Sequence, residues 1–273
     1  CASASTGRAS RRIVAAPQKS RVVDSSSRSG SSDAGSENAE ANATASSSAS
    51  DVNNLDHLTR VTGAFLRDVS ESDPVAPLAD IRWTVADLAA HLGEVHRWAA
   101  GNARTGKRGE RQNVPELSVP LAAWYEESRD ILLTTLEELD PAADCYTLST
   151  VDRSVAFWHR RQLFETLVHL WDLRRAVDAA APPAPEVPPE VHADGVSELF
   201  DVFLPRSSDA DRIDLGGGIR LIATDAGHVW SFGSDWRREG DVDVAATVSA
   251  PAGGLLLWVW NRARARDGVR REG

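Results

Sequence analysis

Two side chains that can bind a metal ion, Glu165 and His169, lie four residues apart in the second half of the chain. In an α-helix this spacing puts both on one face, so a carboxylate oxygen and an imidazole nitrogen can reach the same point. A helix commonly offers two ligands to a divalent metal in this way. The spacing therefore favours a mononuclear metal site, and a hydrogen-bonded or solvent-exposed Glu–His pair is the alternative interpretation.

The helix expected to carry this pair spans about residues 154–180 and is apolar on nearly every other side. Such a helix belongs inside a domain, where unpaired carboxylates and imidazoles are costly. We therefore expect its polar stripe to be satisfied internally. At 100° per residue, the stripe falls within about 60° of one direction. It comprises Trp158, Arg161, Gln162, Glu165, His169 and Asp172.

A third ligand is expected from a facing helix that runs from Val85 to about Ala100. Two histidines flank the apolar stripe of this helix, with His91 about 60° from its centre and His96 about 80° to the other side. Both can point inward, so spacing alone leaves either as the third ligand. Two imidazoles and one carboxylate leave a coordination position open, which is typical of catalytic rather than structural zinc sites.

The elements that must position these residues are helical over residues 51–181. Apolar residues recur there at helix spacing in four segments, which polar or proline-containing loops separate. Thr84 and Asp87 have the spacing of a capping pair and predict a helix start. We interpret residues 51–181 as a four-helix bundle.

The pattern changes after a proline-rich segment at residues 182–190, which we interpret as a stiff, extended linker. Residues 191–273 combine helical and alternating segments, and this mixture predicts a small α+β domain. The expected elements are a helix over 191–204, strands over 212–224, 229–233 and 241–249, and a closing helix over 251–263.

Residues 1–50 are rich in serine and alanine and almost free of aromatic residues, so we predict a disordered tail. Because the chain begins with Cys1 and contains no methionine, we expect that its natural start is missing or was processed. Cys1 and Cys145 are too few for a disulfide framework, which favours a reducing cytoplasm.

The charge of the chain argues against nucleic acid as a partner. The net charge is −10, but residues 1–28 carry six basic residues and one aspartate, so the remaining chain carries −15. An acidic body repels phosphate backbones. No apolar run reaches the roughly 18 residues of a membrane span, so we expect no membrane partner either.

Two segments carry a family resemblance, WTVADLAAHL at residues 83–92 and FWHRRQLFETLVHLWD at residues 157–172. They resemble the mycothiol-dependent maleylpyruvate isomerase family, whose N-terminal domain is a DinB-like metal-binding bundle. The likeness continues in AATVSAPA at residues 245–252 and covers about residues 53–262. Phe164 departs from the family pattern, in which histidine often stands at this position, but this is not a ligand position.

The resemblance implies which residues bind the metal and what the protein does. It assigns the ligands to His91, Glu165 and His169, in preference to His96. It also implies zinc as the metal, mycothiol as a low-molecular-weight thiol cofactor, and a small electrophile as the substrate.

In an isomerase of this family, the metal-activated thiolate adds to an activated cis double bond and leaves after rotation. In a transferase it stays attached to the electrophile. Arg161 and Asp172 are candidates for residues that contact the ligands, with an ordinary helix salt bridge as their alternative. A non-catalytic metal-binding bundle that serves as a scaffold or sensor is the alternative function.

Overall fold

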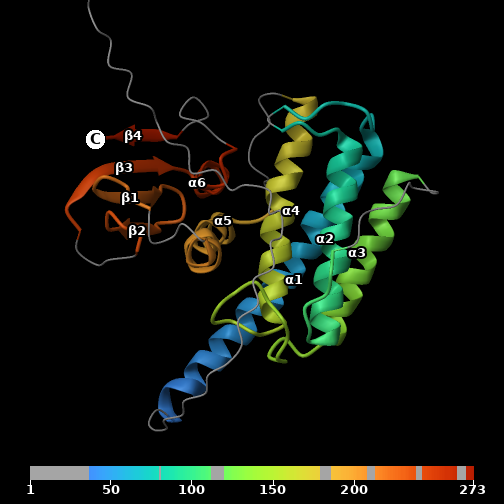
Figure 1. Cartoon of the computed structure of the whole chain (residues 1–273), viewed down its shortest axis with the longest axis horizontal. Coiled ribbons are helices and arrows are strands. Elements are labelled where there is room, and N and C mark those ends of the chain that lie inside the picture. Colours follow the sequence, from blue (N-terminus) through green and yellow to red (C-terminus); the bar gives the residue numbers. More distant parts are fainter. Residues whose placement is uncertain are drawn as a thin grey trace, which may run out of the picture. The chain divides into compact units, whose positions relative to one another are not determined.

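The computed structural model describes residues 37–79, 81–111, 120–178, 186–207, 213–237, 242–262 and 269–273, with side chains from Asn54 onward. Four helices make up the N-terminal part (Figure 1), and this confirms the predicted bundle. Helix α2 packs on α3, and α1 packs on α4. The helices are α1 (Glu37–Glu71), α2 (Val85–Thr105), α3 (Leu121–Glu138) and α4 (Ala156–Val177).

The start of α2 is fixed by the predicted capping pair. The backbone N–H of Asp87 donates to Thr84 Oγ1 at 3.2 Å, and the backbone N–H of Thr84 donates to Asp87 Oδ2 at 2.9 Å. This reciprocal arrangement satisfies two donors that have no partner within the helix. The helix ends at Gly106, whose left-handed backbone (φ 67°) suits glycine.

Helices α2 and α3 approach closely at Gly93. A Cβ atom at this position would lie 2.1 Å from a ring carbon of Trp124. Glycine is therefore required for the Trp124 ring to lie against the α2 backbone. This contact holds α2 in place two residues after His91.

Helix α1 begins earlier than expected. The predicted tail extends to residue 50, whereas the helical backbone of α1 begins at Glu37. Residues 37–50 contain neither proline nor glycine and are rich in alanine, so a helix formed further along the chain can extend through them. Residues 1–36 lie outside the described residues.

The C-terminal part is an α+β unit, as predicted. Helix α5 (Pro189–Glu198) opens at the end of the predicted linker, with Pro189 in its first turn, where proline is well tolerated; residues 179–185 lie outside the described part. A π-helical turn, η1 (Leu199–Phe203), and a 3₁₀ turn, η2 (Leu204–Arg206), continue it. The remaining elements are β1 (Gly218–Ala223), β2 (Val229–Phe232), β3 (Val244–Ala250), α6 (Ala252–Val259) and β4 (Arg270–Glu272).

The four strands form one mixed sheet in the order β2-β1-β3-β4 (Figure 1). Strand β1 is antiparallel to β2 and parallel to β3, and β3 is antiparallel to β4. Strand β4 was not predicted, because three exposed polar residues show no apolar alternation. Within the described residues, no helix combines the length and apolar composition of a membrane span.

Candidate metal centre

His91 on α2 meets Glu165 and His169 on α4. Glu165 Oε1 lies 3.5 Å from His91 Nε2 and 3.3 Å from His169 Nε2. One ligand atom from each residue lies within 4.8 Å of the other two. Ligand atoms around a tetrahedral zinc ion lie about 3.4 Å apart when the bonds are roughly 2.0–2.1 Å long. His91, Glu165 and His169, which we call the trio, therefore fit a divalent ion in both donor type and spacing.

The structure distinguishes His91 from His96, either of which could be the third ligand by spacing alone. His96 is fully buried and lies against Gln162 and Tyr125. Its Nδ1 is 2.8 Å from Gln162 Oε1, and its Nε2 is 3.3 Å from the Tyr125 hydroxyl. Burial lowers the pKa of His96 to about 4, so the ring is neutral in this network. Both ring nitrogens of His96 are thus engaged, whereas His91 points to the Glu165–His169 pair.

An aromatic ring covers the two histidines of the trio. Trp83 directly precedes the capping residue of α2, and its ring centroid lies 4.9 Å from that of His91 and 6.5 Å from that of His169. Arg111 Nη2 lies 3.5 Å from His91 Nδ1 and also contacts Glu94. The capped helix start therefore positions both the candidate ligand His91 and the Trp83 ring that lies against it.

Asp172 orients His169 from one helical turn further along α4. Asp172 Oδ2 lies 3.0 Å from His169 Nδ1, and Arg262 Nε donates to Asp172 Oδ1 at 2.9 Å. Burial opposes protonation of His169, but the bonds to Asp172 and Glu165 outweigh it and raise the pKa of His169 to about 9. A carboxylate on Nδ1 orients the ring, so that Nε2 is directed toward Glu165 Oε1 and would be the nitrogen that faces a metal ion.

Arg161 binds Glu165, the carboxylate among the three candidate ligands. Its guanidinium donates from Nη2 to Glu165 Oε2 and from Nη1 to Glu198 Oε2. The other carboxylate oxygen of Glu165, Oε1, is the one that faces the histidines. Burial alone would raise the pKa of Glu165, but the charge of Arg161 holds it well below its ordinary value. Arg161 and Asp172 thus contact Glu165 and His169, respectively.

Three neighbours of the trio were not expected from the sequence: Trp83, Glu198 and Arg262. Glu198 and Arg262 belong to the C-terminal part and are separated in sequence from their α4 partners by 37 and 90 positions. The available signal for Glu198 was a glutamate just before the mostly apolar segment Leu199–Leu204, because a charge beside such a segment needs a partner once buried.

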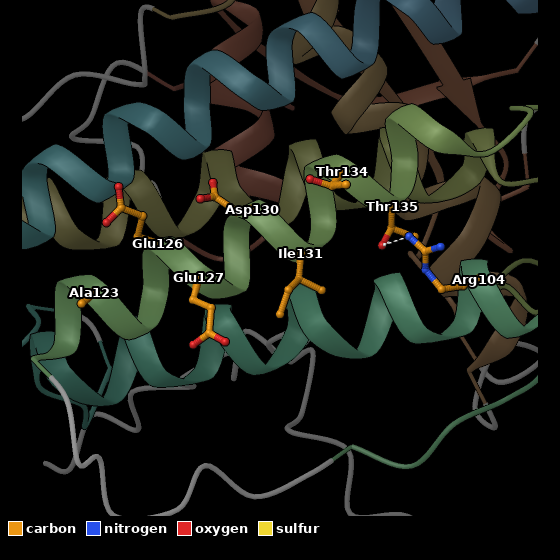
Figure 2. A pocket seen from close by; sticks show the side chains of 8 residues that line it. All are labelled: Arg104, Ala123, Glu126, Glu127, Asp130, Ile131, Thr134 and Thr135. Atoms are coloured by element: carbon orange, nitrogen blue, oxygen red, sulfur yellow. Dashed lines mark hydrogen bonds between the residues drawn. The ribbon is translucent and has the colours of Figure 1, made fainter.

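A surface pocket lies elsewhere, along α3 and one residue of α2 (Figure 2). Three of its eight lining residues carry carboxylates, and Arg104 Nη2 donates to Thr135 Oγ1 there at 3.1 Å. It contains none of the candidate ligands, so this pocket is separate from the candidate metal site. The lining residues are Arg104, Ala123, Glu126, Glu127, Asp130, Ile131, Thr134 and Thr135.

Two family models match the chain and together account for most of it. The mycothiol maleylpyruvate isomerase N-terminal domain matches residues 55–174, and the C-terminal domain of the same family matches residues 190–273. The chain belongs to the mycothiol-dependent maleylpyruvate isomerase family. The N-terminal family domain contains His91, Glu165 and His169, and the C-terminal domain contains Glu198 and Arg262.

Solved structures of this family share the fold. The crystal structure of the mycothiol-dependent maleylpyruvate isomerase has 16% sequence identity and a TM-score of 0.57, and the match covers 81% of this chain and 92% of that chain. The crystal structure of a histidine-to-alanine mutant of that enzyme matches with the same identity and coverage and a TM-score of 0.58. No curated protein matches the chain in sequence.

Proposed function

We propose that this member of the maleylpyruvate isomerase family is a metal-dependent enzyme that uses mycothiol. The observation that carries the proposal is the convergence of His91, Glu165 and His169 within 4.8 Å of one another. Three protein ligands leave a coordination position for an exogenous ligand, as catalytic zinc sites do. Two imidazoles and one carboxylate also suit zinc, which we propose as the metal.

Two exogenous groups would supply the reactive chemistry. When bound, the metal supplies Lewis acidity that makes a neighbouring thiol acidic enough to exist as thiolate near neutral pH. Mycothiol supplies the nucleophilic sulfur, either for cis–trans isomerisation of a substrate such as maleylpyruvate or for transfer to a small electrophile.

The residues of the chain hold and orient this site. Asp172 fixes the His169 ring through Nδ1, so that Nε2 is directed to the trio. Arg161 binds one oxygen of Glu165 and keeps this carboxylate ionised, while the other oxygen faces the histidines. The Trp83 ring lies against the His91 ring and so restricts its movement on that side.

The proposed partners are a small electrophile and a low-molecular-weight thiol, and the acidic body disfavours nucleic acid. We place the protein in the cytoplasm, since such thiols are kept reduced there and the chain has only two cysteines.

The test combines metal analysis with turnover. Purified protein should carry zinc, should isomerise maleylpyruvate only when mycothiol is added, and should lose both metal and turnover in His169→Ala. Zinc binding without isomerisation or thiol transfer would favour a non-catalytic scaffold or sensor instead. Full retention of metal in His169→Ala would show that the trio is not the metal site.

A further inference from the structure

Glu198, the last residue of α5, is a fully buried carboxylate with unequal oxygens. Its Oε2 accepts a hydrogen bond from Arg161, whereas Oε1 has no hydrogen-bond partner among the described residues. An unpartnered buried carboxylate oxygen costs free energy, because it loses its water without replacement. Among the described residues, the hydrogen bond from Arg161 is the one that compensates for this cost. The buried position of Glu198 is therefore explained by its contact with Arg161.

That partner is held from several sides by the C-terminal part. The guanidinium carbon of Arg161 lies 5.0 Å from the centroid of the Phe203 ring and 5.4 Å from that of the Trp260 ring. Both distances are in the range of cation–π contacts. Phe203 ends the π-helical turn that follows Glu198 directly, and single π-helical turns are frequent at functional sites. Arg161 is only 4% exposed.

These contacts determine how the Arg161 guanidinium binds Glu165. A guanidinium presents parallel N–H groups that can bind both oxygens of one carboxylate. Here Nη1 is directed to Glu198 and Nη2 to Glu165 Oε2, so that Glu165 Oε1 stays with His91 and His169. Without a negative charge at position 198, the guanidinium would turn onto both oxygens of Glu165 and compete with a metal ion for Oε1.

We propose that Glu198 is a positioning residue of the metal centre, which holds Arg161 so that only one oxygen of Glu165 is occupied. The inference rests on the proposed metal function of His91, Glu165 and His169. By this proposal the C-terminal part affects metal affinity through Glu198, which acts on Glu165 by way of Arg161 and does not itself contact the ion.

Glu198→Gln tests this, because it keeps the size of the side chain and removes its charge. The probe is Co²⁺ added to metal-free protein, with affinity measured by competition with a chromophoric chelator and geometry read from the visible spectrum of the bound ion. We expect Glu198→Gln to bind Co²⁺ about 10–100-fold more weakly, with an altered spectrum. Glu198→Asp keeps the charge but shortens the side chain. Its affinity for Co²⁺ should lie between those of the unmodified protein and Glu198→Gln.

Asp194→Asn is the matched control. Asp194 accepts two hydrogen bonds from Arg160, at 2.9 and 2.8 Å, and so joins the same two helices without touching a candidate ligand. We expect this variant to keep the affinity and the spectrum within twofold of the unmodified protein, a criterion on the order of a few tenths of a kcal/mol.

Three outcomes would overturn the inference. Unchanged affinity and spectrum in both Glu198→Gln and Glu198→Asp would show that Glu198 does not act on Glu165. Equal weakening in Asp194→Asn and Glu198→Gln would reduce its role to packing of α5 on α4. An unmodified protein that binds no Co²⁺ would refute the proposed metal function as well, which separates the two failures.

Discussion

His169 and Asp172, one turn apart on α4, are joined by a hydrogen bond of 3.0 Å between Nδ1 and Oδ2. Arg262 holds the same carboxylate from the other side at 2.9 Å. We predict that Asp172→Ala weakens metal binding about 10–100-fold, because His169 loses the acceptor that fixes its ring. Chelator competition measures this effect, and an unchanged dissociation constant would mean that α4 alone orients the ring.

The three candidate ligands should be individually necessary for metal binding. The unmodified protein should hold about one divalent ion per chain, and His91→Ala, Glu165→Ala and His169→Ala should each lose most of it. Elemental analysis of the purified proteins provides the measurement.

His96→Ala is the control for the ligand variants, because His96 is buried in a hydrogen-bonded network outside the trio. It should keep the metal. It should also lower the free energy of unfolding by about 1–3 kcal/mol, since Gln162 and Tyr125 lose a buried partner. Metal loss in His96→Ala equal to that in His91→Ala would contradict the assignment.

Cys145 should be dispensable for turnover. Its side chain is buried, and this burial raises the pKa of the thiol to about 11, so the thiolate is scarce near neutral pH. We therefore expect Cys145→Ser to keep most of its activity, with turnover strictly dependent on added mycothiol. Turnover without added thiol that disappears in Cys145→Ser would mean that the protein supplies its own nucleophile.

Glu198 should make the stability of the protein depend on pH. Burial raises the pKa of this carboxyl to about 7, although its arginine neighbours oppose the shift. Between about pH 4.5 and 7 the folded state therefore binds more protons at this site than the unfolded chain does. The stabilising effect of this raised pKa is complete below pH 4.5 and is lost as the pH rises to 7. The charged groups that act on Glu198 are Arg160, Arg161, Asp194 and Glu165.

Urea unfolding of metal-free protein at several pH values measures this effect. The stability of the unmodified protein relative to Glu198→Gln should fall by roughly 1–3 kcal/mol from pH 4.5 to pH 7.5. A difference that does not change with pH would place the pKa of Glu198 near its ordinary value.

Removal of residues 1–36 should leave the metal content and the thermal midpoint nearly unchanged. This segment is rich in serine and nearly free of aromatic residues, so its composition offers little to a hydrophobic core. A second deletion, of residues 1–50, also removes the first turns of α1 and measures their contribution. A midpoint many degrees lower in the shorter deletion would show that the segment packs on the remaining chain.

Periodicity was sufficient to predict the parts of the site that lie on one helix. Glu165, His169, Arg161 and Asp172 share one face of α4, and helix geometry alone brings the first two together. The choice of His91 over His96 required the family resemblance, because both flank the apolar stripe of α2. Only the packed structure shows that His96 is buried against Gln162 and Tyr125.

The contacts between the two parts of the chain could not be predicted in this way. Glu198, the partner of Arg161, ends α5, and Arg262, the partner of Asp172, lies in the segment that follows α6. Neither position shares a period with α4. The short strand β4 is likewise defined by its backbone pairing with β3 and not by its side chains. Tertiary packing, which carries no local signal, sets all three features.

The trio joins α2 to α4, and the whole of α3 lies between these helices in the sequence. An unfolded chain therefore contains at most the local Glu165–His169 pair, and the complete ligand set exists only after distant segments have met. An ion that binds this set acts as a reversible cross-link that closes a long loop. Metal at a thousandfold excess over its dissociation constant would stabilise the folded state by about 4 kcal/mol, so metal occupancy would report on the assembly of the bundle itself.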